Sequence, residues 1–181
     1  IETGLSSDPL MNWRWSALDN ITLISNSDAH SPEKLGREAN VFQFGSDKEI
    51  AYAEIMRIIA EGANPSTSLG AGRFLYTIEF YPEEGKYHYD GHLACKFSCP
   101  PSETKKKYHG ICPVCKKPLT IGVMYRVDEL ADRSDAEARQ LKRIPYKSLV
   151  PLPEIIANVL ECGVATKGVR VVYDQLIEKV A

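Results

Sequence analysis

The sequence predicts a mixed α/β fold that is followed by a small four-cysteine module and by further helices. Three observations support this prediction: short apolar runs that alternate with a helical pattern in the first third of the chain, two close cysteine pairs, and helical patterns near the C-terminus. The chain has 181 residues, of which 44% are hydrophobic and 25% are charged, as in ordinary globular proteins. Its formal net charge of −2 excludes a uniformly basic nucleic-acid coat, but it permits a local basic patch.

No apolar run is long enough to span a membrane, and the first residues, IETGLSSDPL, lack the pattern of a signal peptide. We therefore expect a cytoplasmic protein. The chain has no initiator Met, and its first residues have the pattern of a strand that is already under way. We therefore expect an internal fragment of a larger protein.

Residues 1–62 have the pattern of the last units of a parallel α/β fold. A short buried strand is predicted at residues 23–25, and residues 11–19 (MNWRWSALD) indicate a short helix or a packed loop. Ser31 and Pro32 then have the pattern of a helix N-cap and a first helical residue.

The clearest helix of the sequence covers residues 46–62. Ser46 and Glu49 form a capping box, apolar residues recur on one face, and Gly62 supplies the stop. Residues 63–74 are rich in glycine and other small residues, which predicts a flexible linker and a domain boundary.

A second domain is predicted over residues 75–127, and a helical region over residues 128–181. Apolar and polar residues alternate around a Pro-Glu-Glu-Gly turn in residues 75–92, which predicts a β-hairpin or a strand pair. The helical region contains three helical patterns, over residues 128–148 (ending before Pro145), 151–163 and 167–181.

Four of the five cysteines have the spacing of metal ligands. Three residues separate Cys95 from Cys99, two residues separate Cys112 from Cys115, and twelve residues lie between the pairs. Two thiolate pairs on tight turns can complete a tetrahedral shell around Zn²⁺, so we expect a structural zinc site with no open position. A disulfide framework is the alternative, but it is typical of small secreted domains.

Three further residues could take part in this chemistry. His92 and His109 are close enough in sequence to replace a cysteine ligand, although four thiolates already complete the shell. Cys162 is alone in an apolar helical pattern and is predicted to be a buried core residue.

A basic segment joins the two cysteine pairs. Lys105, Lys106 and Lys107 precede Tyr108, so this segment could contact the phosphate backbone of a nucleic acid. A solvated loop is the alternative for such a lysine run.

Asp28 and His30 follow the predicted strand at residues 23–25 and are two residues apart, so both side chains could point to the same side. A carboxylate and an imidazole at the carboxyl end of a strand are typical of ligand and metal sites in α/β proteins. A turn-capping role for Asp28 and a surface position for His30 are the alternatives.

Four segments follow one another along residues 1–133. They are ETGLSSDPLMNWRWSALD, SNSDAHSPEKLGREAN, TIEFYPEEGKYHYDGH (followed by the cysteine pairs) and LTIGVMYRVDELADR. Together they resemble the endonuclease Q family. RIPYKSLVPLPEII continues the resemblance, whereas the linker NPSTSLGAGRF has no counterpart in it.

The resemblance implies a PHP-type, TIM-like barrel, of which residues 1–62 are the C-terminal part, followed by a four-cysteine zinc module and helices. It implies a metal-dependent endonuclease that nicks DNA 5′ of deaminated bases, such as uracil and hypoxanthine, or of abasic sites. Asp28 and His30 are then catalytic and bind divalent ions (Zn²⁺, Mn²⁺ or Mg²⁺), and DNA that contains deaminated bases is the partner.

The resemblance also implies that the active site is incomplete in this chain. The His-x-His and the later ligands that PHP domains place in their first strands are absent, so the chain alone is expected to be inactive. His88, Asp90 and His92 could be considered as replacements, but the family pattern assigns them to the approach to the zinc module.

Residues near the N-terminus could contact DNA phosphates or support the metal ligands. They are Glu2, Ser6, Ser7, Asn12 and Arg14. Loop and helix-cap roles are the alternative for these residues. Two other functions also stay open: a non-catalytic, zinc-dependent nucleic-acid-binding module, and a PHP phosphoesterase that acts on a small phosphate ester.

Overall fold

A computed structural model describes residues 1–45, 50–62, 72–85 and 88–180. The chain divides into two compact units, Ile1–Ser148 and Leu149–Ala181. The predicted capping box of Ser46 and Glu49 lies outside the described residues, as does most of the predicted linker at 63–74.

The prediction of a mixed α/β chain is confirmed. The strands are β1 (Ala39–Gln43), β2 (Arg73–Glu79), β3 (Asp90–His92), β4 (Phe97–Cys99) and β5 (Tyr146–Ser148). The helices of the first unit are α1 (Pro9–Trp13), α2 (Tyr52–Glu61), α3 (Pro101–Glu103), α4 (Val123–Leu130) and α5 (Asp135–Arg139). The helices of the second unit are α6 (Leu152–Val159) and α7 (Lys167–Val180).

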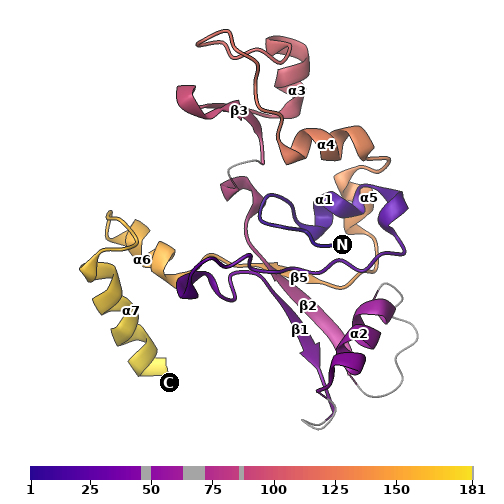
Figure 1. Cartoon of the computed structure of the whole chain (residues 1–181), viewed down its shortest axis with the longest axis vertical. Helices are drawn as coiled ribbons and strands as arrows, with labels where there is room; N and C mark the ends of the chain where they lie inside the picture. The colour runs from indigo at the N-terminus through magenta and orange to yellow at the C-terminus, as the bar shows by residue number, and fades with distance from the viewer. Residues whose placement is uncertain (46–49, 63–71, 86–87, 181) are drawn as a thin grey trace. The chain divides into compact units, whose positions relative to one another are not determined.

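A three-stranded sheet organises the first unit (Figure 1). The strand order is β1-β2-β5, with β1 antiparallel and β5 parallel to the central β2. β2 begins in the last two residues of the predicted linker and pairs with β1, which precedes the linker, so the segments on both sides of it share one sheet. A barrel stays a prediction.

The predicted β-hairpin or strand pair within residues 75–92 is wrong. β2 belongs to the three-stranded sheet, whereas β3 pairs with β4 in a separate two-stranded ribbon. A 3-10 turn at Pro82–Glu84 follows β2. The backbone N–H of His88 then donates to the carbonyl of Gly85 at 3.0 Å, shortly before the ribbon begins. The Pro-Glu-Glu-Gly segment therefore separates two sheets instead of closing a hairpin.

The predicted helix at Ser31 and Pro32 is a single 3-10 turn, Pro32–Lys34, without a side-chain cap. Leu35 is already extended, and Gly36 has a φ of 75°, a conformation that suits glycine and ends the turn. The chain therefore changes direction here and continues into β1.

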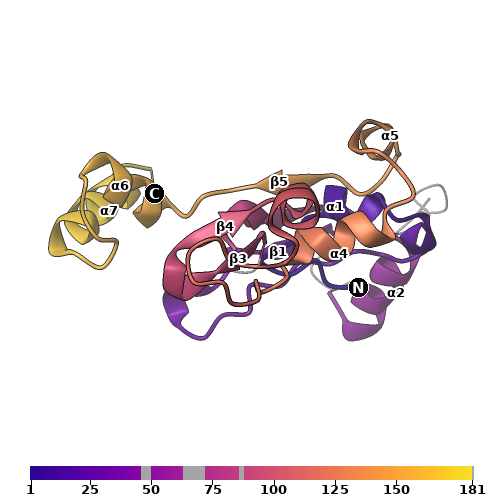
Figure 2. The same ribbon diagram turned by 90° about the horizontal axis from the view of Figure 1, so that it is seen from above.

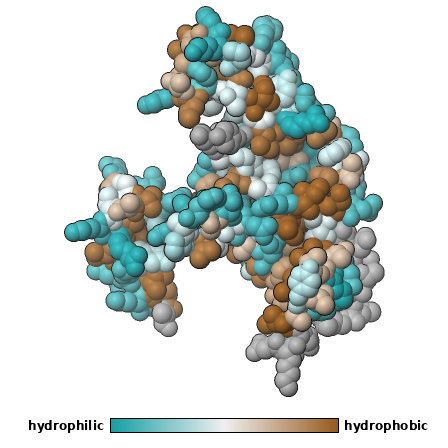
Figure 3. Space-filling view, in the orientation of Figure 1, coloured by the Kyte–Doolittle hydropathy of each residue, from teal (hydrophilic) through white to brown (hydrophobic). Residues whose placement is uncertain are grey.

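α2 confirms the core of the helix predicted over residues 46–62. The backbone N–H of Gly62 donates to the carbonyl of Ile58 at 2.9 Å, so the predicted glycine stop is confirmed. Ile58 is buried against the sheet side, while Tyr52 and Met56 are exposed, and hydrophobic atoms reach the surface over this helix (Figure 3).

α1 lies beside α4 in both ribbon views (Figures 1 and 2) and also packs on α5. Asp8 caps α1 by accepting a hydrogen bond from Met11 N at 2.8 Å. The predicted charged helix over residues 128–148 is two helices, because the backbone N–H groups of Asp132 and Arg133 donate to the carbonyl of Arg14. Because these two N–H groups bond to Arg14, they cannot donate to carbonyl groups of a continuous helix, and the helix is interrupted here.

The second unit is a pair of helices, α6 and α7, whose small core contains Ile156, Ala157 and Val169. α6 ends at Val159, so Cys162 lies in the turn and is exposed, and the prediction of a buried Cys162 is wrong. No helix in the described part of the chain combines the length and apolar character needed to cross a membrane.

Candidate functional site

One histidine and three cysteines converge beside the ribbon of β3 and β4. The ligand atoms of His92, Cys95, Cys112 and Cys115 all lie within 4.8 Å of one another. His92 Nδ1 is 3.1 Å from Cys95 Sγ and 3.3 Å from Cys115 Sγ. This His–Cys₃ cluster can bind a metal ion, and it supplies all four ligands of a tetrahedral shell from the protein.

Two turns with the same ligand spacing build the His–Cys₃ cluster. In each, two residues separate the ligands, and the residue after the second ligand is a lysine in the left-handed region, with φ of 49° at Lys96 and 62° at Lys116. The Lys96 N–H donates to Leu93 O and the Lys116 N–H donates to Cys112 O, both at 3.0 Å. Each turn therefore brings its two ligands to one side.

Cys99 is not part of this cluster, which differs from the expected set of four cysteines. Cys99 pairs with Asp90 in the ribbon, whereas His92 pairs with Phe97, so Cys99 lies at the other end of the ribbon from His92. Its sulfur contacts Thr104 Oγ1 at 3.2 Å, and it packs in the small core of the module. The missed signal was the His92-x2-Cys95 spacing, which matches Cys112-x2-Cys115.

The thiols of the cluster differ in acidity. Burial, with Cys115 and Cys112 adding to it, raises the pKa of Cys95 to about 11. Burial acts to raise the pKa of Cys112, but hydrogen bonds from the backbone N–H groups of Cys115 and Val114, together with those to the Cys115 and Cys95 side chains, lower that pKa overall. A bound metal cation stabilises the thiolate form of all three cysteines. The cluster is therefore better suited to bind a metal ion than to remain a group of neutral thiols.

The base of the module is clamped where the chain enters and leaves it. Gly91 and Thr120 exchange backbone hydrogen bonds of 2.9 and 2.7 Å, and the buried Asp90 accepts a bond from Gly122 N at 2.7 Å. A side chain at Gly122 would come within 2.5 Å of the backbone of Tyr89. Glycine is therefore required at this crossing.

The three possible ligands in the YHYDGH segment have separate surroundings. His92 belongs to the His–Cys₃ cluster, Asp90 holds Gly122, and the buried His88 contacts the carbonyl of Ser6 at 3.1 Å through Nδ1.

Asp28 and His30 lie together in an exposed loop. His30 Nδ1 is 2.9 Å from the carbonyl and 3.9 Å from the carboxylate of Asp28, whose φ is 43°. The side chains are 86% exposed for His30 and 69% exposed for Asp28. Within the described residues, the His–Cys₃ cluster is the one group of three or more metal-ligating side chains, so Asp28 and His30 stay a predicted metal site.

Two buried carboxylates near this loop were not predicted. Glu79 accepts hydrogen bonds from Thr3 at 2.9 Å, Ser25 at 3.1 Å and Thr77 at 2.5 Å. Glu38 lies one position beyond the Ala39–Ile78 pair of β1 and β2, which brings it close to Glu79.

Burial raises the pKa of both carboxyl groups, that of Glu38 to about 7, and the neighbouring Glu79 adds to the rise at Glu38. A polar residue at a buried strand position is the signal that could have found Glu79.

The residues near the N-terminus are engaged within the protein. Ser7 Oγ donates to the carbonyl of Thr3, and Asn12 Nδ2 donates to the carbonyl of Asp8 at 2.8 Å, as loop and helix-cap residues do. Ser6 presents its carbonyl to His88, and Glu2 forms an isolated parallel bridge with Ile24.

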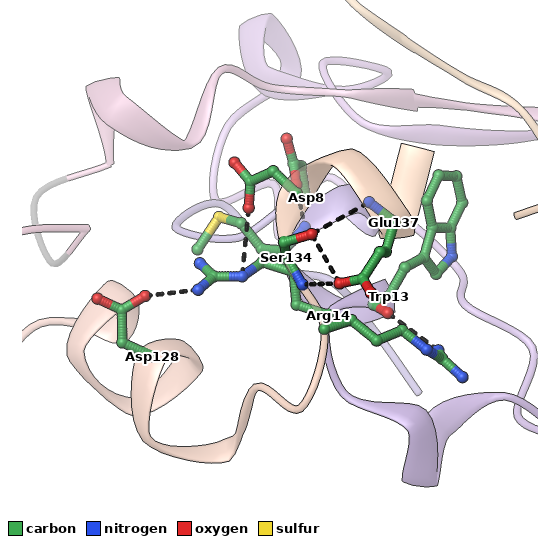
Figure 4. A network of polar contacts seen from close by, with 9 residues as sticks. Asp8, Trp13, Arg14, Asp128, Ser134 and Glu137 are labelled. Carbon is green, nitrogen blue, oxygen red and sulfur yellow. Dashed lines mark hydrogen bonds and ion pairs between the residues drawn. The ribbon is translucent and has the colours of Figure 1, made fainter. Parts of the chain in front are cut away.

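Arg14 is held in a polar network between α1 and α4 (Figure 4). Its Nη2 donates to Asp128 at 2.9 Å, and its Nε lies 3.2 Å from Asp135. Arg133 binds Asp19 with two nitrogens and donates to the carbonyl of Trp13 at 3.2 Å.

The basic segment is helical and not a loop. Residues Thr104–Tyr108 form a π-helical turn after α3. The ring of Tyr108 packs edge-on against Phe97 with 5.0 Å between ring centroids, so Tyr108 is part of the module core. Lys105 Nζ lies 4.3 Å from the centre of the Tyr125 ring.

No protein-family model matches the chain. An uncharacterized protein of Methanocaldococcus jannaschii is 31% identical over 185 residues, which cover 99% of this chain and 22% of the relative. The crystal structure of the lesion-specific endonuclease PfuEndoQ from Pyrococcus furiosus matches 98% of this chain, with a TM-score of 0.78 and 32% identity. The resemblance to endonuclease Q is confirmed.

A second endonuclease Q structure, in complex with a 27-mer duplex substrate with an abasic lesion at the active site, matches with a TM-score of 0.78 and 30% identity. The chain spans 42% of each of these endonuclease Q chains.

Proposed function

We propose that this chain serves in an endonuclease Q-like DNA repair nuclease. The supporting observation is the match over 98% of the chain, at 32% identity and a TM-score of 0.78, to a lesion-specific endonuclease. We infer that the reaction is metal-dependent hydrolysis of a phosphodiester 5′ of deaminated bases (uracil or hypoxanthine) or of abasic sites. The neighbour with a duplex that carries an abasic lesion supports DNA as the partner.

Asp28 and His30 are the proposed catalytic ligands. Their side chains are exposed and lie on one loop, so both can reach a shared divalent ion (Zn²⁺, Mn²⁺ or Mg²⁺). Such an ion activates water and neutralises charge on the phosphodiester. The buried Glu79 supports this loop, because its carboxylate accepts a bond from Ser25, which precedes the loop.

The His–Cys₃ cluster is the proposed structural zinc site. Three thiolates and one imidazole are donors that Zn²⁺ binds well, and no ligand position is left for substrate. This ion stabilises the module and takes no part in hydrolysis.

Nicking of DNA by the complete protein tests the proposal. Asp28→Ala and His30→Ala should each abolish nicking of a uracil-containing or abasic duplex while affinity for the duplex changes by no more than a few-fold, because the lost group holds a metal and not the DNA. His109→Ala, an exposed histidine of the module, is the matched control and should nick normally.

Equal loss of binding and nicking in the Asp28 and His30 variants would assign these residues a structural role. Duplex binding without nicking in the unmodified protein would favour the non-catalytic binding module. Turnover of small phosphate esters without any effect on DNA would favour the phosphoesterase.

A further inference from the structure

A cavity of about 580 Å³ lies where three segments of the first unit meet. Arg14 follows α1, Lys105 and Lys106 lie in the π-helical turn after α3, and Asp128 and Arg133 lie on α4 and just beyond it. We call this the seam cavity. Its lining combines residues that are more than a hundred positions apart in the sequence, such as Arg14 and Asp128. Neither the arginine nor the lysines therefore indicate the cavity in the sequence alone.

The arginine of the seam cavity is fixed before any ligand arrives. Asp128 accepts a hydrogen bond from Arg14 Nη2, and Asp135 forms an ion pair with the guanidinium, 3.2 Å from Nε; the Arg14 side chain is only 15% exposed. A guanidinium carries more N–H donors than these two contacts use, so Arg14 keeps donors for an anion in a fixed geometry.

The three consecutive lysines of the π-helical turn differ in their surroundings. Lys105 and Lys106 line the seam cavity, and within the described residues no carboxylate forms an ion pair with either. Lys107 does not line it, and its Nζ lies 3.7 Å from Glu103. The positive charge that the π-helical turn brings to the seam cavity therefore comes from Lys105 and Lys106 and not from Lys107.

The lining also indicates the chemistry of the ligand. Besides the cations it contains the hydroxyl of Ser102 and a single small apolar side chain, Ala131, so it offers no surface on which a base could stack. Two carboxylates line it as well: Asp128 is paired with Arg14, and Asp132, which accepts a bond from Ser16 N at 2.8 Å, lies close to Arg133. The lining suits a phosphate group.

We propose that the seam cavity binds a phosphodiester group of the duplex DNA backbone. Lys105 and Lys106 neutralise its charge, and Arg14 donates to its oxygens. The proposal rests on the proposed nuclease function, because that function makes duplex DNA the partner. Phosphate contacts carry no sequence information, so the cavity holds the duplex in register and does not select the lesion.

Salt-dependent binding to an undamaged, fluorescently labelled duplex tests this proposal in the complete protein. Lys105→Ala and Lys106→Ala should each weaken binding several-fold and reduce the slope of log K against log salt concentration by about 0.9, the value for one lost phosphate contact. Lys107→Ala removes the same charge one residue further along and should leave both quantities within error.

The possible outcomes separate the seam-cavity proposal from the proposed nuclease function. Equal losses for all three lysine variants would indicate general surface charge and overturn the seam cavity. Unchanged slopes for Lys105→Ala and Lys106→Ala, in a protein that still binds and nicks DNA, would overturn the cavity and leave the nuclease proposal intact. Absence of duplex binding in the unmodified protein would overturn both.

Discussion

At the scale of single residues, Glu38 and Glu79 are two buried carboxyl groups that lie close together in the first unit. Burial raises the pKa of Glu38 from its ordinary 4.5 to about 7, and the carboxylate of Glu79 contributes. The folded state therefore binds a proton that the unfolded state releases between these two pH values. The contribution of Glu38 to stability is consequently most favourable below about pH 4.5 and is lost as the pH rises through about 7.

Glu38→Gln should raise the free energy of unfolding by roughly 1–3 kcal/mol near pH 8, because a neutral amide avoids the cost of a buried charge. The gain should be much smaller near pH 4.5. Urea unfolding at both pH values measures it, with the exposed Glu84→Gln as control. A gain of equal size at both pH values would contradict the role of ionisation.

At the scale of elements, the two turns of the His–Cys₃ cluster make the module depend on its metal. Such sites form only on folding, so removal of a bound zinc ion should unfold residues 88–125. Cys112→Ser should lose both the metal and this structure, whereas Cys99→Ser should keep both, because the Cys99 sulfur contacts Thr104 and not the cluster.

Metal analysis and circular dichroism before and after chelation measure these changes. Equal metal loss in the Cys99 and Cys112 variants would restore the four-cysteine set. A protein that contains no zinc at all would contradict the assignment of the ion.

The elements also show which features of the fold are predictable from sequence. Helices with local signals, such as α2 with its Gly62 stop, and three of the four clustered ligands were predictable, because turns and short spacings are local. The choice of His92 over Cys99 depends on the register of β3 with β4, and the burial of Glu38 depends on the register of β1 with β2. Register is set by tertiary packing and is not visible in a single sequence.

At the scale of the whole first unit, ion pairs join the N-terminal segment to the segment that follows the module. Asp19 binds both Arg133 and Arg143, the latter at 2.6 Å, and the hydrogen bond from Arg133 lowers the pKa of the Asp19 carboxyl group. Stability from this group is therefore present at neutral pH and is lost as the pH falls through its lowered pKa.

Asp19→Asn should lower the free energy of unfolding by about 1 kcal/mol near pH 7, since the partners are partly exposed and solvent screens them. High salt should shrink the difference. Thermal unfolding measures the change, and Asp174→Asn, which breaks an exposed i,i+4 pair with Arg170, should cost less. A larger effect in the Asp174 variant would contradict the importance of the Asp19 contacts.

The closed base of the module has a consequence for how such a chain can change. Because Gly91 and Thr120 are hydrogen-bonded to each other, the polypeptide departs from the rest of the unit and returns to it at one point. We expect insertions or deletions between these residues to leave the register of β2 with β5 unchanged, because the hydrogen-bonded pair holds both ends of the stretch. We therefore expect this stretch to accept length changes at positions away from Ser102, Lys105 and Lys106, which line the seam cavity together with residues of α4.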